Sequence, residues 1–82
     1  MHELSIAVNI VDIASEEAQR LRARRVEAVH LKVGALSGVA KEALLFAWEL
    51  ASEDTVIAGS RLAIQDTPGR ELEVTALEIE DG

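Results

Sequence analysis

The chain has 82 residues, 49% of them apolar, and is expected to form a single domain over residues 1–82. It contains no cysteine, which excludes disulfides and thiolate metal sites, and its net charge of −7 disfavours nucleic acid as a partner. No apolar run approaches the roughly 18 residues of a membrane span, and no basic leader opens the chain, so we expect a cytoplasmic protein without a membrane partner.

The first predicted element is a helix over residues 4–22, where apolar residues recur at steps of three and four. Ser5 is a candidate cap for its start. A second apolar row widens the face and hints at a dimer contact beside the core. The main row is Leu4, Ala7, Val8, Val11, Ala14, Ala18 and Leu21, and the second is Ile6, Ile10 and Ile13. The arginines near the helix end are interpreted as offsetting its dipole; they are Arg20, Arg22, Arg24 and Arg25.

A strand is predicted over residues 25–34, with a bulge near Ala28 where the apolar phase slips. Residues 34–38 contain two glycines and are interpreted as a loop. A second helix is expected from Ser37 or Gly38 onward, over about residues 39–52. Its predicted core row is Ala40, Ala43, Leu44, Ala47, Trp48 and Ala51.

Two further strands are predicted over residues 61–66 and 71–80, the second with a bulge near Ala76. Pro68 and Gly69 between them suit the centre of a type II turn, although that turn is unusual for a two-residue hairpin and a wider loop stays open. The expected fold class is α+β, with two helices packed on one face of a three-stranded, mainly antiparallel sheet.

Catalytic motifs are missing from the sequence, which argues against an enzyme. The N-terminus offers different chemistry. The α-amine of Met1 and the amide nitrogens of His2 and Glu3 follow one another along the backbone, and the His2 imidazole can fold back toward them. Such a nitrogen set favours tetragonal Ni(II) or Cu(II) rather than tetrahedral zinc. His30 is interpreted as a surface residue of its strand, beside Lys32.

A wider pattern supports that interpretation. The opening Met1–Ala7 and the block Val33–Val39 resemble two segments of HypA, the nickel metallochaperone family of [NiFe]-hydrogenase maturation. The second helix, over Glu42–Leu44 and Phe46–Glu49, is similar to that of the family, as is the final strand, Leu72–Glu80. The resemblance implies a nickel metallochaperone that binds Ni(II) through Met1, His2 and Glu3. It also implies a HypB-type GTPase and a hydrogenase large subunit as partners.

The sequence departs from the family at three places. HypA proteins carry a zinc domain with four cysteines between their last two strands, and here that insertion is missing between about residues 69 and 71, so no zinc is expected. Ala40 stands where some members have an acidic residue, and Ala35 where many have Glu. The alternative hypothesis is an interaction or dimerisation module of the same pathway, with a homodimer formed by strand exchange at the shortened connection.

Overall fold

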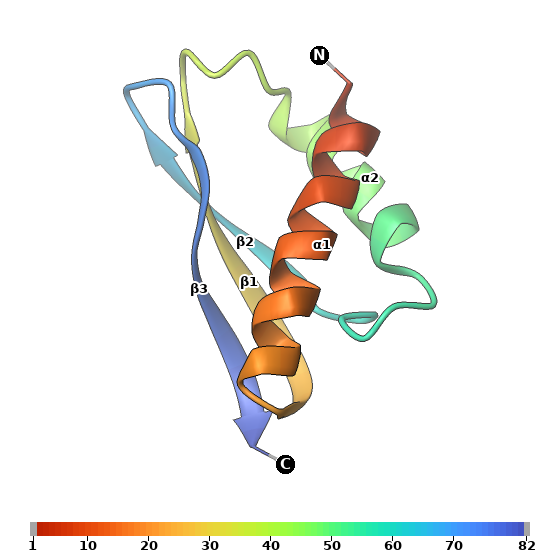
Figure 1. Cartoon of the computed structure of the whole chain (residues 1–82). Coiled ribbons are helices and arrows are strands. Elements are labelled where there is room, and N and C mark those ends of the chain that lie inside the picture. Colours follow the sequence, from red (N-terminus) through yellow and green to blue (C-terminus); the bar gives the residue numbers. More distant parts are fainter. Residues whose placement is uncertain (1, 82) are drawn as a thin grey trace.

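The computed structural model describes residues 2–81, which form two helices and three strands. They are α1 (Glu3–Arg20), β1 (Ala23–Gly34), α2 (Lys41–Ser52), β2 (Arg61–Thr67) and β3 (Leu72–Asp81). The strands make one sheet in the order β2-β1-β3, and both helices lie on the same face of it (Figure 1). The predicted α+β class is therefore confirmed. The sheet is mixed, since β1 pairs antiparallel with β3 over its whole length and parallel with β2 over its second half.

The core lies between the sheet and the two helices. Its largest fully buried side chains are Val29 and Leu31 from β1, Leu44 from α2, and Ile57 from the loop that follows α2. Alanine supplies three of the five buried residues of α1, so the helix axis can approach its neighbours closely. The buried residues of α1 are Ala7, Ile10, Val11, Ala14 and Ala18.

The outer members of both predicted helical rows are not in the core, and that part of the prediction is wrong. The exposed members are Leu4, Val8, Ile13 and Leu21 in the rows predicted for the first helix, and Ala40 and Ala43 in the row predicted for the second. The three-stranded sheet and one neighbouring helix cover only a narrow arc of each helix. The predicted apolar faces are wider than this arc, so their edges are left in solvent.

The predicted cap of α1 is also wrong. The helix begins at Glu3 with His2 at the N-cap, no side chain caps it, and Ser5 already lies within the first turn. The first helical hydrogen bond runs from the Ile6 N–H to the His2 carbonyl at 3.1 Å, so the helix starts earlier than the periodicity predicted. The second helix begins at Lys41, two residues later than predicted, after Gly38 in a left-handed conformation (φ +80°).

Both predicted bulges are confirmed by shifts in the β1–β3 register. Val26 pairs with Ile79 and Ala28 with Glu78, which leaves Glu27 as an extra residue on β1. On β3, Thr75 is the extra residue, next to Ala76. These shifts explain how residues that are out of phase in the sequence face the same core.

The connection from β2 to β3 differs from the predicted turn. The two strands do not pair, because β1 lies between them, and residues 68–71 cross over the end of β1 (Figure 1). Gly69 does not adopt the positive φ that a type II turn requires there. Backbone hydrogen bonds fix the crossing: the Gly34 N–H donates to the Glu71 carbonyl at 2.7 Å and the Leu36 N–H donates to the Gly69 carbonyl at 2.8 Å.

Candidate metal site at the N-terminus

The predicted site residues lie at the start of α1. Met1 falls outside the described residues, His2 is exposed at the N-cap, and Glu3 is the first helical residue. The carbonyl of His2 accepts the first helical hydrogen bond, but amides at the beginning of an α-helix have no acceptor within the helix. The amide nitrogens of His2 and Glu3 therefore stand outside the helical ladder, and their loss of protons would break none of its bonds.

The side chain of Glu3 joins the start of α1 to the start of α2. Its Oε2 accepts a hydrogen bond from the backbone N–H of Ala40 at 3.1 Å. Ala40 is the N-cap of α2 and has no side chain that can cap the helix, so Glu3 supplies an anionic acceptor at that end. The Ala40 N–H is the main reason why the pKa of the Glu3 carboxyl is lowered from 4.5.

The contact places Ala40 beside the N-terminal segment, where the resemblance had suggested an acidic neighbour. The methyl group of Ala40 offers no ligand, and its backbone amide is a donor toward Glu3. Spacing could not reveal this contact, because the two residues are 37 positions apart in the sequence. Ala35, the other departure from the family pattern, is exposed and donates its N–H to the Thr67 carbonyl at the β2–β3 crossing.

Side chains alone do not form a metal site in the structure. Over residues 2–81, no three His, Cys, Asp or Glu side chains converge as a ligand group. A metal at this terminus would therefore need backbone nitrogen ligands together with the His2 imidazole. Nitrogen ligands of that kind suit a metal that prefers a square arrangement.

The other histidine lies on the sheet face opposite the helices. Nε2 of His30 is 2.5 Å from Oε2 of Glu78, and the Arg61 guanidinium lies 3.2 Å from the same oxygen. The hydrogen bond from His30 is the largest cause of the lowered pKa of Glu78. His30 thus makes a side-chain hydrogen bond on the surface of β1, in agreement with its interpretation as a surface residue.

Comparison with known proteins decides the family. Residues 1–79 match the family model described as "Hydrogenase/urease nickel incorporation, metallochaperone, hypA". The chain belongs to the HypA family. That family, by its description, consists of carriers of nickel rather than enzymes.

Curated HypA proteins align with most of the chain. The hydrogenase maturation factor HypA of Chloroflexus aurantiacus is 52% identical over 68 residues, which are 83% of this chain and 60% of the relative. HypA of a Roseiflexus species is 50% identical over 68 residues, 83% of this chain and 55% of its own length. The chain thus spans 60% or less of the length of these two relatives.

Solved HypA structures share the fold. The solution structure of the nickel metallochaperone HypA from Helicobacter pylori superposes with a TM-score of 0.86 over 100% of both chains, at 20% identity. A second solution structure of a HypA protein gives a TM-score of 0.76 over 96% of both chains. Over residues 2–81, no helix is long and apolar enough to cross a membrane.

Proposed function

We propose that this HypA-family chain binds Ni(II) through Met1, His2 and Glu3 and delivers the ion during [NiFe]-hydrogenase maturation. Nickel is the cargo of this reaction. The observation that carries the proposal is the position of His2 and Glu3 at the N-cap and first residue of α1, where their amide nitrogens take no part in the helix. The His2 side chain is exposed beside them.

The ligand chemistry follows from the backbone. A free α-amine has a pKa near 8, so it loses its proton more readily than a lysine does. The amine and the next two amide nitrogens close two five-membered chelate rings around one ion, and the His2 imidazole adds a further nitrogen. This set favours Ni(II) over zinc, while Cu(II) would bind more tightly still. Selection of nickel over copper must therefore depend on which metal is supplied.

The carboxylate of Glu3 has a positioning role in this proposal. Its hydrogen bond to Ala40 holds the first turn of α1 against the start of α2. Glu3 then contributes its amide nitrogen, and its side chain orients the segment that carries the ligands. His2, one residue earlier, remains exposed and accessible to an acceptor protein.

Blocking the amine tests the site directly. We expect acetylation of Met1, or one extra residue before it, to lower nickel affinity by at least about tenfold, because one chelate ring is lost. His2→Ala should have a comparable effect and should remove the yellow d–d band of a planar nitrogen site. His30→Ala is the matched control, since it removes the other histidine of the chain. Unchanged affinity after amine blockage, or equal losses for His2→Ala and His30→Ala, would contradict the proposed ligands.

The delivery role implies protein partners. As the resemblance suggests, we propose a HypB-type GTPase as the source or regulator of nickel and a hydrogenase large subunit as its recipient, in the cytoplasm. Zinc is not part of the proposal, because the chain has no cysteine. Equilibrium dialysis against nickel and zinc together should show nickel retained and zinc lost.

A second candidate is an interaction or dimerisation module. Phe46 is 71% exposed and Leu45 is 44% exposed on α2, which is unusual for large apolar side chains of a small monomer. Under this alternative, Phe46 and Leu45 pack against a second copy of the chain. The two copies form a dimer by exchanging strands at residues 68–71. Sedimentation of the wild type and of Phe46→Lys distinguishes the cases: a monomer of 8.8 kDa in both samples argues against a dimer.

A further inference from the structure

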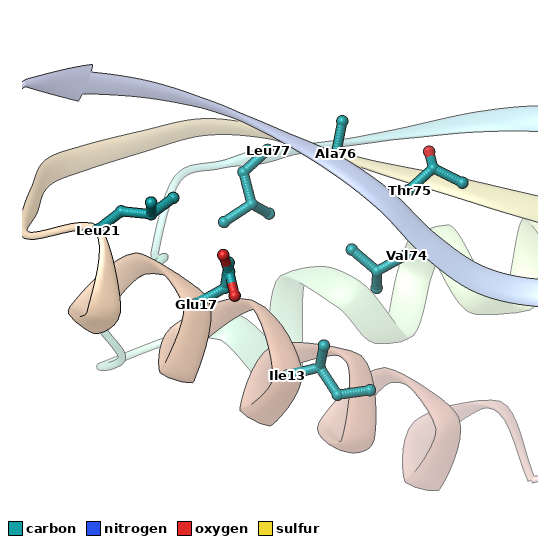
Figure 2. A pocket seen from close by; sticks show the side chains of 7 residues that line it. All are labelled: Ile13, Glu17, Leu21, Val74, Thr75, Ala76 and Leu77. Atoms are coloured by element: carbon teal, nitrogen blue, oxygen red, sulfur yellow. The ribbon is translucent and has the colours of Figure 1, made fainter.

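A groove runs along the outer edge of the sheet, between α1 and β3, and lies apart from the N-terminal site. Its cavity volume is about 260 Å³. Figure 2 shows Ile13 and Glu17 on α1, and Leu21 just after it, pointing toward Val74 and Leu77 on β3. Ile13 is 53% exposed and Leu21 is 43% exposed, so the groove walls offer apolar surface to solvent.

The strand beside this groove has an unpaired side. In the order β2-β1-β3, β3 is an edge strand, and only its inner side pairs with β1. The bulge at Thr75 interrupts the strand at the level of the groove, and regular pairing with β1 resumes at Ala76, which lies opposite His30. An extended segment could therefore pair with the outer backbone of β3 on both sides of the bulge while placing apolar side chains in the groove.

Charge decides which kind of segment fits. On the sheet face away from the helices, β3 exposes Glu73, Glu78 and Glu80. Glu78 is held by His30 and Arg61, whereas Glu73 and Glu80 have no cation within ion-pairing distance among residues 2–81. Their cross-strand neighbours on β1 are Lys32 and Arg25, on the inner side of the strand. The outer side of β3 is thus bordered by carboxylates.

The same charges disfavour a second copy of the chain. Pairing of β3 with another β3 would place carboxylates opposite carboxylates, and like charges in cross-strand positions are destabilising. Acidic side chains on an edge strand commonly prevent self-association in this way. A strand with Lys or Arg on one face and aliphatic residues on the other would match both the carboxylates and the groove.

We propose that the α1–β3 groove is a docking site for an extended, basic segment of a partner protein, which adds to the sheet at β3. Its aliphatic side chains enter between Ile13, Leu21 and Leu77, and its basic side chains lie beside Glu73 and Glu80. This surface is separate from the nickel ligands, so partner and metal can be held at the same time.

A designed peptide provides the probe. We expect a peptide of about nine alternating lysine and valine residues, matched to the length of β3, to shift the amide resonances of β3 and of α1 around Ile13. The same shifts from a glutamate–valine peptide, or shifts confined to other elements, would overturn the proposal. A dimer that Ile13→Ser dissociates would show that β3 pairs with a second copy of the chain at this edge, and would also overturn the docking proposal.

A matched pair of variants tests the groove. Ile13→Ser removes an exposed groove residue of α1, and Leu50→Ser removes an equally exposed residue of α2, at 53% and 54% exposure. Ile13→Ser should lower the affinity for the lysine–valine peptide about fivefold or more, because an apolar contact is lost, while Leu50→Ser leaves the affinity unchanged.

A charge reversal tests the acidic border of the strand. Glu73→Lys should lower the affinity for the same peptide, because the new lysine repels the basic side chains of the peptide. Equal affinities for all three variants and wild type would refute the docking site. Nickel binding of Ile13→Ser should equal that of the wild type, which keeps this test separate from the N-terminal proposal.

Discussion

The close crossing of the β2–β3 connection over β1 makes Gly34 the most sensitive glycine of the fold. A Cβ atom at position 34 would lie 2.1 Å from the carbonyl oxygen of Gly69, 2.5 Å from its carbonyl carbon and 2.7 Å from the amide nitrogen of Glu71. All three are backbone atoms, so no side-chain rotation can relieve the clash. Gly34→Ala must therefore move the connection away from the strand.

The cost can be worked from the contacts that such a movement breaks. Overpacking of this kind costs about 1–3 kcal/mol. Three backbone hydrogen bonds hold the crossing, from the amides of Gly34, Ala35 and Leu36 at 2.7, 2.8 and 2.8 Å, and each contributes about 1 kcal/mol. Loss of one or two of these hydrogen bonds adds about 1–2 kcal/mol to the cost of the clash. Alanine also makes the unfolded chain stiffer than glycine does, which offsets about 0.4–1 kcal/mol of that cost. We expect a net loss of about 2–4 kcal/mol, a large part of the roughly 4–12 kcal/mol expected for a domain of this size.

Urea denaturation followed by tryptophan fluorescence measures this loss. Trp48 is the single tryptophan, is buried, and donates its indole N–H to the Ser60 carbonyl at 3.0 Å, so its emission reports unfolding. Gly59→Ala is the control, because Gly59 has a φ of +82° and a Cβ there meets no atom within 4 Å. It isolates backbone strain, about 1 kcal/mol. If Gly34→Ala loses no more stability than Gly59→Ala, the reasoning from the close crossing is refuted.

Three further substitutions test the packing and the contact between the helices. Leu44→Ala removes a side chain that is 0% exposed and should cost about 2–5 kcal/mol, measured by calorimetry; a cost below about 1 kcal/mol would contradict its place in the core. Trp48→Phe leaves the Ser60 carbonyl without its indole donor and should cost about 1–3 kcal/mol in urea unfolding followed by circular dichroism. Glu3→Gln should destabilise the chain at neutral pH, since the lowered pKa of Glu3 means that its stabilisation is present above 4.5 and is lost as pH falls through the lower folded value. Thermal melts of Glu3→Gln and wild type should therefore converge in acid, and a gap that is constant with pH would count against the contact with Ala40.

Hydrophobic periodicity predicted all five elements and both bulges. The phase slips between Val26 and Val29 and between Val74 and Leu77 are visible in the sequence, because a bulge is the only way for both phases to face one core. The edges of the helical rows were harder to predict. Periodicity places Leu4 on the same face of α1 as the core residues. How far the sheet extends beneath that face is a property of the whole fold, which local periodicity does not contain.

The central position of β1 could not be deduced from local signals. Pro68 and Gly69 between two strands favour a hairpin when only sequence neighbours are considered. In the structure, β1 takes the place between β2 and β3, and its last residue is the glycine that tolerates the crossing. The sequence does not distinguish a glycine that is required by a close backbone crossing from an ordinary loop glycine. Gly34 fits both descriptions, because it stands at the end of a predicted strand.

The proposed metal site illustrates a different limit of sequence reasoning. Most of its ligands are backbone atoms, which every protein has, so the identity of His2 is the one side-chain signal for it. What distinguishes this terminus is its position: α1 begins at Glu3, which leaves the first amides outside the helical ladder, and the Glu3 carboxylate attaches that turn to the Ala40 amide. The second feature depends on how α1 packs against α2, because Ala40 approaches Glu3 only once the core has formed. The proposed ligand residues His2 and Glu3 are therefore positioned by tertiary structure although they are adjacent in sequence, and loosening the α1–α2 contact should weaken nickel binding even when His2 is intact.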